Sequence, residues 1–284
     1  MPTIIDGKAV AAKVKDEVAK DAAILKEKGI IPSLAVIIAG NDSASRVYVN
    51  NKKKDCGEVG INSIEYALSE NCTMQELLLL IEELNNRKDI NGILVQLPLP
   101  KQLDERAILS AININKDVDA FHPVNVGKIM IGEFDFLPCT PAGIMEMLDY
   151  YNIDVKGKHC VVIGRSNIVG KPMAMLLLHR HGTVTICHSR TNNLAEICKS
   201  ADIIVAAVGK RAFVTADMVK DNAVIIDVGT NRNDLGKLCG DVDFEAVKDK
   251  ASFITPVPGG VGPMTRAMLL KNTIKAAKLQ NGIE

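Results

Sequence analysis

The sequence predicts an α/β protein of two domains, each built around a parallel sheet, with a cleft between them. Its 284 residues are enough for two domains that each bury a core. The continuous apolar run at residues 34–39 is typical of a strand buried on both faces, and residues 92–97 indicate another buried strand. Segments with helical spacing of apolar residues separate these runs, and such alternation favours parallel strands joined by right-handed crossovers.

The first part of the chain alternates helix and strand. Apolar residues at helical spacing, glycine stops and capping patterns define the helices. The expected elements, in order, are a helix that includes Val10 to Leu25 and stops at Gly29, a strand at 34–39, a helix carrying Tyr48 and Lys52, a strand at 63–68, a helix opened by the capping box Thr73-x-x-Glu76, and a strand at 92–97.

Residues 113–139 show little periodicity and are rich in loop-forming residues, so we place a domain boundary there. Beyond it the alternation resumes. The expected elements are a helix started by Thr140-Pro141, a strand at 159–163, a helix at 168–181 ended by Gly182, strands at 183–187, 203–208 and 223–228, and a last helix from Pro263 to about Leu279.

Composition excludes several classes of protein. Lys plus Arg and Asp plus Glu number 34 each, and this balance argues against a nucleic-acid or membrane-surface binder. We find no signal-peptide pattern and no apolar run of membrane-spanning length. The seven cysteines are odd in number and never form Cys-x-x-Cys, so we expect reduced, mostly buried thiols in a cytoplasmic protein and no zinc site.

A strand-to-helix junction at residues 161–172 resembles the phosphate-binding turn of a dinucleotide-binding unit. Gly164 can form the tight turn, Gly170 lets helix and strand approach, and the helix N-terminus offers N–H groups to a pyrophosphate. Ser166 stands where Gly-x-Gly-x-x-Gly has its middle glycine. Taken alone, the turn is a weak signal, and a structural βα connection without a ligand is a serious alternative.

The end of the next strand favours NADP over NAD. NAD-binding units hold the ribose 2′-hydroxyl with an acidic residue at this place, and here the sequence has none. Ser189 and Arg190, with Arg165 from the first turn, suit a 2′-phosphate through charge-assisted hydrogen bonds. The alternative is that Arg190 is a solvated loop charge.

A second candidate site involves Tyr48, Lys52 and Gln96. Tyr48 and Lys52 are four residues apart and share a helix face, and Gln96 ends a strand at the edge where open α/β sheets bind ligands. Spacing alone does not select Lys52 from the lysines beside it, which are more often solvated charges. Tyr-x-x-x-Lys also occurs in short-chain dehydrogenases, but there it follows the dinucleotide turn.

The chain closely resembles the bifunctional methylenetetrahydrofolate dehydrogenase/methenyltetrahydrofolate cyclohydrolase family, nearly from end to end. The motifs that carry the resemblance are Ser45-x-x-Tyr48-x-x-x-Lys52, Val95-Gln96-Leu97-Pro98-Leu99-Pro100, Lys116-Asp117-Val118-Asp119, Gly164-Arg165-Ser166-x-x-Val169-Gly170-x-Pro172, Asp227-Val228-Gly229-Thr230-Asn231, Gly240-Asp241-Val242-Asp243 and the run from Thr255 to Thr265.

The resemblance implies a role for particular residues. Lys52 is the implied catalytic lysine, with Tyr48 beside the folate and Gln96 as hydrogen-bonding partner, and Asp119 holds the pterin ring. Further implied folate contacts are Leu97, Pro98, Pro258, Gly259 and Gly260. The implied cofactor contacts are Gly164, Arg165, Ser166, Val169, Gly170, Ser189, Arg190 and Thr230. Without the resemblance, Asp117, Asp119 and His122 form a polar loop or, less readily, a metal site.

One position departs from the family pattern. Ala120 stands where we expect glycine, and alanine strains the loop if the position needs a positive φ.

The resemblance also implies domain arrangement and activity. We expect a folate domain at 1–137, joined by the last helix at 263–284, an NADP-binding Rossmann domain at 138–262, an active site in the cleft, and a homodimer formed through the cofactor domain. The implied reactions are oxidation of 5,10-methylenetetrahydrofolate with NADP and hydrolysis of the methenyl product to 10-formyltetrahydrofolate. The alternatives are a monofunctional, NAD-linked dehydrogenase and a module that senses dinucleotide or folate without turnover.

Overall fold

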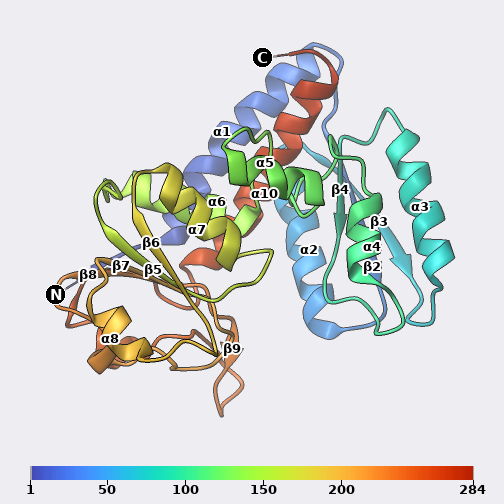
Figure 1. Ribbon diagram of the computed structural model, residues 1–284. Helices are drawn as coiled ribbons and strands as arrows, with labels where there is room; N and C mark the ends of the chain where they lie inside the picture. Colours follow the sequence, from blue (N-terminus) through green and yellow to red (C-terminus); the bar gives the residue numbers. More distant parts are fainter. Residues whose placement is uncertain (1, 284) are drawn as a thin grey trace. The chain divides into compact units, whose positions relative to one another are not determined.

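The computed structural model describes residues 2–283, apart from the side chain of Ala44, and divides into two compact units (Figure 1). One unit comprises Met1–Ala11 and Thr140–Thr265; the other comprises Ala12–Cys139 and Arg266–Glu284. Each unit has a parallel sheet of its own, so the two-domain α/β class is confirmed.

The N-terminus differs from the domain limits expected from the sequence. Strand β1 (Thr3–Ile4) pairs in parallel with β11 (Ala251–Ile254), and the Ile5 N–H donates to Ile254 O at 2.9 Å. Ile5 is fully buried. Residues 1–11 therefore group with the dinucleotide-type unit rather than with the unit that contains Lys52.

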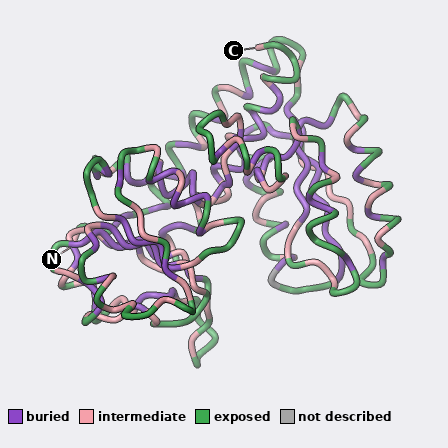
Figure 2. The backbone as a smooth tube through the Cα atoms, viewed as in Figure 1, coloured by how far each residue is buried: buried purple, intermediate pink, exposed green. Residues whose placement is uncertain are grey.

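The first unit contains a six-stranded, fully parallel sheet in the order β1-β11-β8-β7-β5-β6. Its inner strands are nearly all apolar and buried, as Figure 2 shows. The remaining elements of this sheet and its connections are β5 (His159–Ile163), α7 (Gly170–His179), β6 (Thr183–Cys187), α8 (Leu194–Lys199), β7 (Ile203–Ala206), the 3-10 turn Ala216–Met218, β8 (Ala223–Asp227), the short pair β9 (Asn231–Arg232) and β10 (Leu238–Cys239), and α9 (Phe244–Val247).

The second unit contains a three-stranded parallel sheet in the order β3-β2-β4. The central strand β2 (Ser33–Ala39) is buried along its whole length, as its apolar run predicts. The other strands are β3 (Asn62–Leu68) and β4 (Gly92–Val95), and the helices are α2 (Ser43–Glu58), α3 (Met74–Asn86), α4 (Glu105–Ala111) and α5 (Pro123–Ile131). The capping box of Thr73 and Glu76 is present at the start of α3.

Three long helices lie at or near the division between the units in sequence. The division falls inside α1 (Gly7–Glu27) and α10 (Val261–Gln280), and α6 (Cys139–Tyr150) begins next to it. All three helices were expected from the sequence. In α10, the side chain of Gln280 donates to the backbone oxygens of Asn91 and Asn115, at 2.8 Å each, and so ties the chain end to the second unit.

Helix α5 lies in the stretch expected to be irregular. His122 caps it, with the ring Nδ1 accepting the Val124 N–H at 3.1 Å, and Pro123 occupies the first turn. Gly132 ends it in the left-handed conformation, at φ 82°. The helix has only nine residues, so its apolar periodicity is too short to stand out in the sequence.

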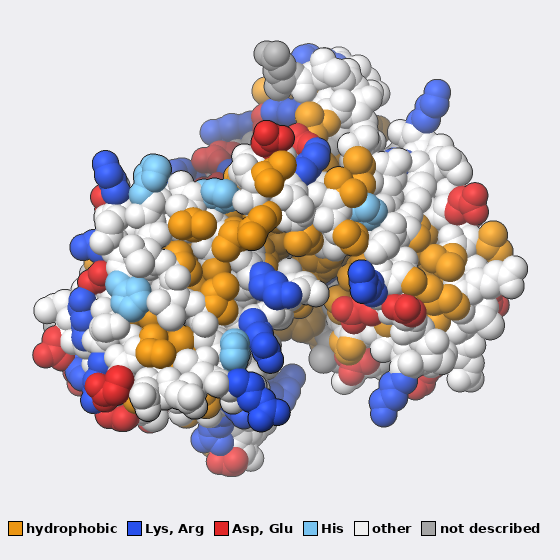
Figure 3. Space-filling view, in the orientation of Figure 1, with side chains coloured by type: hydrophobic (Ala, Val, Ile, Leu, Met, Phe, Trp, Pro, Cys, Tyr) orange, Lys and Arg blue, Asp and Glu red, His pale blue; other side chains and the backbone are white. Residues whose placement is uncertain are grey.

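Surface charge is mixed. Figure 3 shows Lys and Arg side chains gathered toward the lower edge of the unit with the six-stranded sheet, with acidic side chains elsewhere on the same face. Within residues 2–283, no helix combines the length and apolar character needed to cross a membrane.

Candidate active site

Helix α2 places Tyr48 and Lys52 one turn apart on one face. The helix begins at Ser43 and is capped by Asp42, whose carboxylate accepts the Ser45 N–H at 2.7 Å. Tyr48 is 42% exposed and Lys52 is half-buried. The tyrosine ring is thus available to a ligand beside the lysine.

Strand β4 brings Gln96 to Lys52. The strand ends at Val95, one residue before Gln96, but the Gln96 N–H still donates to Ile37 O at 2.8 Å and continues the ladder with β2. The side chain therefore starts from the carboxyl end of the sheet. Lys52 Nζ donates to Gln96 Oε1 at 2.9 Å, and Gln96 Nε2 donates to the Leu97 carbonyl at 2.6 Å.

The segment that leads to Asp119 lies along the free edge of β4. The Ile93 N–H donates to Lys116 O at 2.8 Å. The buried Lys116 ammonium donates to the Leu84 carbonyl at 2.9 Å and to the Arg87 carbonyl at 2.6 Å, at the end of α3. A cation on these last carbonyls of a helix is favourable, and here it fixes the start of the Asp119 loop.

Asp117 closes that loop. Its carboxylate accepts the N–H groups of Phe121 at 3.1 Å and His122 at 2.9 Å, and Asn125 Nδ2 at 2.7 Å. Asp117 therefore has a structural role. Across the described residues, no group of three His, Cys, Asp or Glu side chains is placed to hold a metal ion.

Asp119 lies beside a buried thiol. Cys139 Sγ donates to Asp119 Oδ1 at 3.3 Å. Burial raises the pKa of Asp119, and this is opposed by the nearby Lys52 charge and by the Cys139 hydrogen bond. The next residue, Ala120, is buried and has φ 57°, so the position does adopt the left-handed conformation that favours glycine.

The environment of Lys52 lowers its pKa. Removal from water is the largest cause, and the positive charge of Arg266 acts in the same direction. The carboxylate of Asp119 opposes it. A lysine with a lowered pKa has more neutral amine at a given pH than an ordinary lysine, so it can accept and return a proton more readily.

Arg266 is held near Lys52 by a buried carboxylate. Asp55, one turn after Lys52 on α2, is 5% exposed, and its Oδ2 lies 2.8 Å from Arg266 Nε. Its Oδ1 pairs with Lys15 Nζ. No sequence pattern selects Lys15, Asp55 and Arg266, because they come from three separate helices, α1, α2 and α10.

The predicted dinucleotide turn has the close packing that requires glycine. A Cβ on Gly164 would lie 2.4 Å from the Ala207 carbonyl oxygen, and one on Gly170 would lie 2.3 Å from the Gly164 oxygen. Ser166 Oγ accepts the N–H groups of Val169 at 3.1 Å and Gly170 at 3.2 Å. Two N–H groups at the start of α7, the helix end expected to offer donors to a pyrophosphate, are therefore bonded to Ser166.

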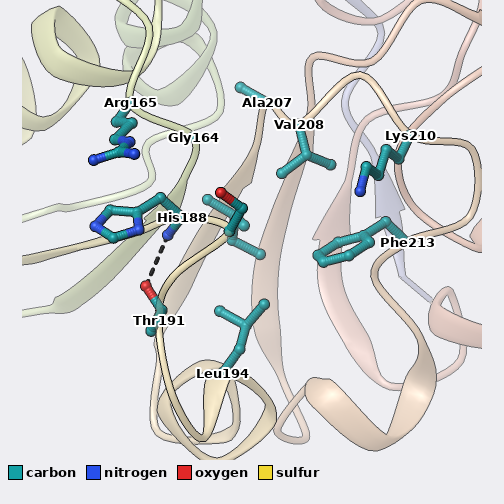
Figure 4. A pocket seen from close by; sticks show the side chains of 11 residues that line it. Gly164, Arg165, His188, Thr191, Leu194, Ala207, Val208, Lys210 and Phe213 are labelled. Atoms are coloured by element: carbon teal, nitrogen blue, oxygen red, sulfur yellow. Dashed lines mark hydrogen bonds between the residues drawn. The ribbon is translucent and has the colours of Figure 1, made fainter.

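A pocket of about 420 Å³ opens beside this turn (Figure 4). Arg165 and His188 lie on one side of it, and Lys210 and Phe213 lie on the other. Its lining residues are Ile163, Gly164, Arg165, His188, Ser189, Thr191, Leu194, Ala207, Val208, Lys210 and Phe213. The apolar part suits an adenine ring, and the end with Arg165 and Ser189 suits a phosphate group. These residues fit a dinucleotide.

Some predicted cofactor residues do not line the pocket. The Arg190 side chain is exposed, and the backbone N–H of Arg190 donates to His188 Nδ1 at 3.1 Å. Thr230 is exposed in the loop after β8, and neither residue lines the pocket. Conversely, His188, Leu194, Val208, Lys210 and Phe213 line the pocket but were not predicted. His188 is next to the predicted residue Ser189. Leu194 comes from α8, and Val208, Lys210 and Phe213 come from the loop after β7, which does not contain a phosphate-binding glycine motif.

The predicted folate-binding residues fall in both units. Tyr48, Gln96, Leu97, Pro98 and Asp119 belong to the unit of Lys52, and Pro258, Gly259 and Gly260 belong to the unit with the six-stranded sheet. The turn at Pro258–Gly260 is closed by the Gly260 N–H, which donates to Pro256 O at 2.9 Å. A Cβ on Gly7 would lie 1.8 Å from the Gly260 oxygen, so the start of α1 packs directly on this turn.

A Rossmann-type unit with a glycine-packed strand-to-helix turn beside a pocket that fits a dinucleotide, and a second unit in which a half-buried lysine contacts a glutamine at a strand end, are the features of a dinucleotide-dependent enzyme. Comparison with known proteins identifies which one. Residues 5–119 match the model of the tetrahydrofolate dehydrogenase/cyclohydrolase catalytic domain, and residues 138–281 match that of the tetrahydrofolate dehydrogenase/cyclohydrolase NAD(P)-binding domain. The chain belongs to the tetrahydrofolate dehydrogenase/cyclohydrolase family, as its motifs predicted.

Similar proteins are known from several organisms. The chain is 62% identical to the bifunctional protein FolD of Acetivibrio thermocellus over 277 residues, which cover 98% of this chain and 97% of that one. The crystal structure of the Campylobacter jejuni FolD methylenetetrahydrofolate dehydrogenase/cyclohydrolase matches with a TM-score of 0.97 at 51% identity, covering 98% and 99% of the two chains. The Trypanosoma brucei enzyme, solved with NADP cofactor and inhibitor, matches with a TM-score of 0.94 at 39% identity and 98% coverage of both chains.

Proposed function

We propose that this protein oxidises 5,10-methylenetetrahydrofolate to 5,10-methenyltetrahydrofolate with NADP and then hydrolyses that product to 10-formyltetrahydrofolate. The observation that carries the proposal is the hydrogen bond between Lys52 Nζ and Gln96 Oε1, 2.9 Å long, in a member of this family. Bound NADP supplies the acceptor for the hydride that leaves the methylene carbon. Tyr48, Gln96, Leu97, Pro98 and Asp119 are the proposed folate contacts in the unit of Lys52.

Lys52 is the proposed proton carrier of the hydrolysis. Water adds to the cationic methenyl carbon and gives one proton to the neutral amine of Lys52. The resulting ammonium returns that proton to the ring nitrogen that leaves as its bond to carbon breaks, and the formyl group stays on the other nitrogen. The hydroxyl proton of the adduct goes to solvent as the C=O bond of the formyl group forms, so one proton is released overall. The lowered pKa of Lys52, due chiefly to burial, makes the neutral amine available, and Gln96 holds it in place.

The choice of NADP rests on the pocket of the other unit. Strand β6 ends at Cys187, and the residues that follow it, His188-Ser189-Arg190, include no acidic residue. Arg165, His188 and Ser189 line the pocket and supply the donors that a 2′-phosphate needs. A ribose 2′-hydroxyl would lack its usual carboxylate partner here.

Turnover of 5,10-methylenetetrahydrofolate by the purified protein tests the proposal, with NADP and NAD in parallel and with reduced cofactor and methenyl absorbance followed separately. We expect reduced NADP to form without build-up of methenyl product. Methenyl accumulation would show a dehydrogenase without effective hydrolysis, and faster turnover with NAD would refute the cofactor assignment. If neither cofactor supports turnover, the alternative of a module that binds dinucleotide or folate without turnover would replace the proposal.

We also propose that the protein is a cytoplasmic homodimer joined through the unit with the six-stranded sheet. Strand β6 is the edge of that sheet, and among the described strands it pairs with β5 alone. An edge strand can pair with a second copy. Light scattering of the purified protein tests this: a monomer at micromolar concentration would contradict it.

A further inference from the structure

Two buried carboxylates outside the proposed site are connected to a loop that lines the cofactor pocket. Asp227 ends strand β8, and Asp241 follows the short pair β9–β10; the two are 3% and 0% exposed. Neither contacts the pocket. Both carboxylates accept hydrogen bonds from backbone N–H groups, and two of the donors to Asp241 belong to Val208 and Lys210, which line the pocket.

Asp241 binds the loop that follows β7. Its Oδ2 accepts the N–H groups of Val208 at 2.6 Å and Gly209 at 3.0 Å, and its Oδ1 accepts the Lys210 N–H at 2.9 Å. Asn231 Nδ2 adds a fourth donor to Oδ1 at 2.8 Å. Three consecutive backbone donors on one side chain fix the path of a loop, and Val208 and Lys210 line the pocket (Figure 4).

Asp227 fixes Asp241 in turn. Its carboxylate accepts the N–H groups of Gly229 at 2.9 Å, Asp241 at 2.8 Å and Val242 at 2.9 Å. Burial, together with the negative charge of Asp241, raises the pKa of Asp227 to about 6 against the effect of these donors. A Cβ on Gly240 would lie 1.8 Å from Asp227 Oδ2, so the two segments are in direct contact.

We propose that Asp241, supported by Asp227, is a positioning residue for the cofactor: it sets the wall of the dinucleotide pocket formed by Val208 and Lys210. A carboxylate is needed because it only accepts hydrogen bonds, whereas the NH₂ group of an asparagine would face backbone donors. The inference rests on the proposed use of this pocket by NADP. If Asp241 had a purely structural role, replacing it would lower the stability and both activities of the protein together.

Direct titration with NADPH, followed by its fluorescence, tests this inference in the full-length protein. Binding to the unaltered protein comes first, and its absence would contradict the proposed function itself. For Asp241→Asn we expect the Kd for NADPH to rise about tenfold or more, while hydrolysis of methenyltetrahydrofolate, which consumes no cofactor, stays within about twofold. The matched control is Asp249→Asn, an exposed aspartate of the same unit, which should bind as the unaltered protein does.

Two results would overturn the inference. One is unchanged NADPH binding by Asp241→Asn. The other is a parallel loss of NADPH binding, hydrolysis and thermal stability, which marks a general structural role. If Asp241→Asn does not fold, Asn231→Ser removes only the fourth donor at a half-buried position. It should raise the Kd for NADPH severalfold with hydrolysis intact, and unaltered binding by this variant would likewise contradict the inference.

Discussion

Lys52 on helix α2 and Gln96 at the end of strand β4 are joined by a hydrogen bond of 2.9 Å from Nζ to Oε1. The backbone of Gln96 is held by the sheet through Ile37, so the amide is a fixed acceptor for a flexible side chain. In the proposed hydrolysis, this contact decides where the amine lies when water adds to the folate.

Gln96→Leu should therefore lower the rate of methenyltetrahydrofolate hydrolysis. Leucine keeps the volume but removes the acceptor, and a misplaced catalytic group costs about a hundredfold in rate. The measurement is the decay of methenyl absorbance. Gln102→Leu is the matched control, because Gln102 also bonds a backbone oxygen in this unit, that of Glu70, but lies on an exposed surface. Equal rates in the two variants would remove Gln96 from the mechanism.

Arg266 should influence the pH dependence of hydrolysis. The neutral Lys52 amine is the active form, so the rate should rise with pH through the pKa of Lys52, which lies below that of an ordinary lysine because of burial and the Arg266 charge. Removing a neighbouring cation favours the ammonium form. Arg266→Gln should thus move the pH–rate profile toward higher pH.

Arg180→Gln serves as the control for this shift. Arg180 also pairs with an aspartate, Asp149, but in the other unit. Its removal should leave the profile in place. A profile of Arg266→Gln that coincides with that of the unaltered protein would show that this charge does not act on the group that titrates.

Arg165 rather than Arg190 should determine the preference for NADP. Arg165 lines the pocket, whereas Arg190 does not. A lost charge-assisted hydrogen bond is worth about 1.5–3 kcal/mol, so Arg165→Met should raise the KM for NADP about tenfold to a hundredfold, with little change for NAD. Arg190→Met should have a smaller effect. The measurement is the KM for NADP and for NAD of each variant in steady-state kinetics. A larger rise in the KM for NADP in Arg190→Met than in Arg165→Met would support the assignment of Arg190 made from the sequence.

Gly170→Ala should disrupt the dinucleotide turn. Its Cβ would lie 2.3 Å from a backbone oxygen of Gly164, and backbone atoms cannot move aside cheaply. We expect a loss of about 1–3 kcal/mol in the free energy of unfolding and weaker NADPH binding. Gly127→Ala is the control: Gly127 is exposed in helix α5 with no atom near the added Cβ, so alanine should be neutral or slightly stabilising. Thermal unfolding and NADPH titration of both variants provide the comparison.

The sequence predicts the elements that have strong patterns. Strand β2 is an unbroken apolar run, and the capping box of Thr73 and Glu76 is local in sequence; both were confirmed. The short strand β1 was missed because two residues carry no period, and its pairing with β11 depends on a segment about 250 residues away.

The site was predictable only where a motif marks it. Lys52 and Gln96 were selected by resemblance, and the structure brings them into contact. Arg266 and Asp55 are adjacent only after α2 and α10 pack, and Asp241 reaches the pocket through backbone donors of a distant loop. Such contacts leave no local pattern of spacing or hydrophobicity, so sequence reasoning alone did not find them.

The central claim is that Lys52 carries the proton in the hydrolysis. Its most direct test is the hydrolysis of methenyltetrahydrofolate by Lys52→Ala, with NADPH binding as the check on folding. We predict that hydrolysis falls to the uncatalysed rate while NADPH still binds, and that methenyl product accumulates when the variant oxidises methylenetetrahydrofolate. Hydrolysis at a near-normal rate by this variant would contradict the account.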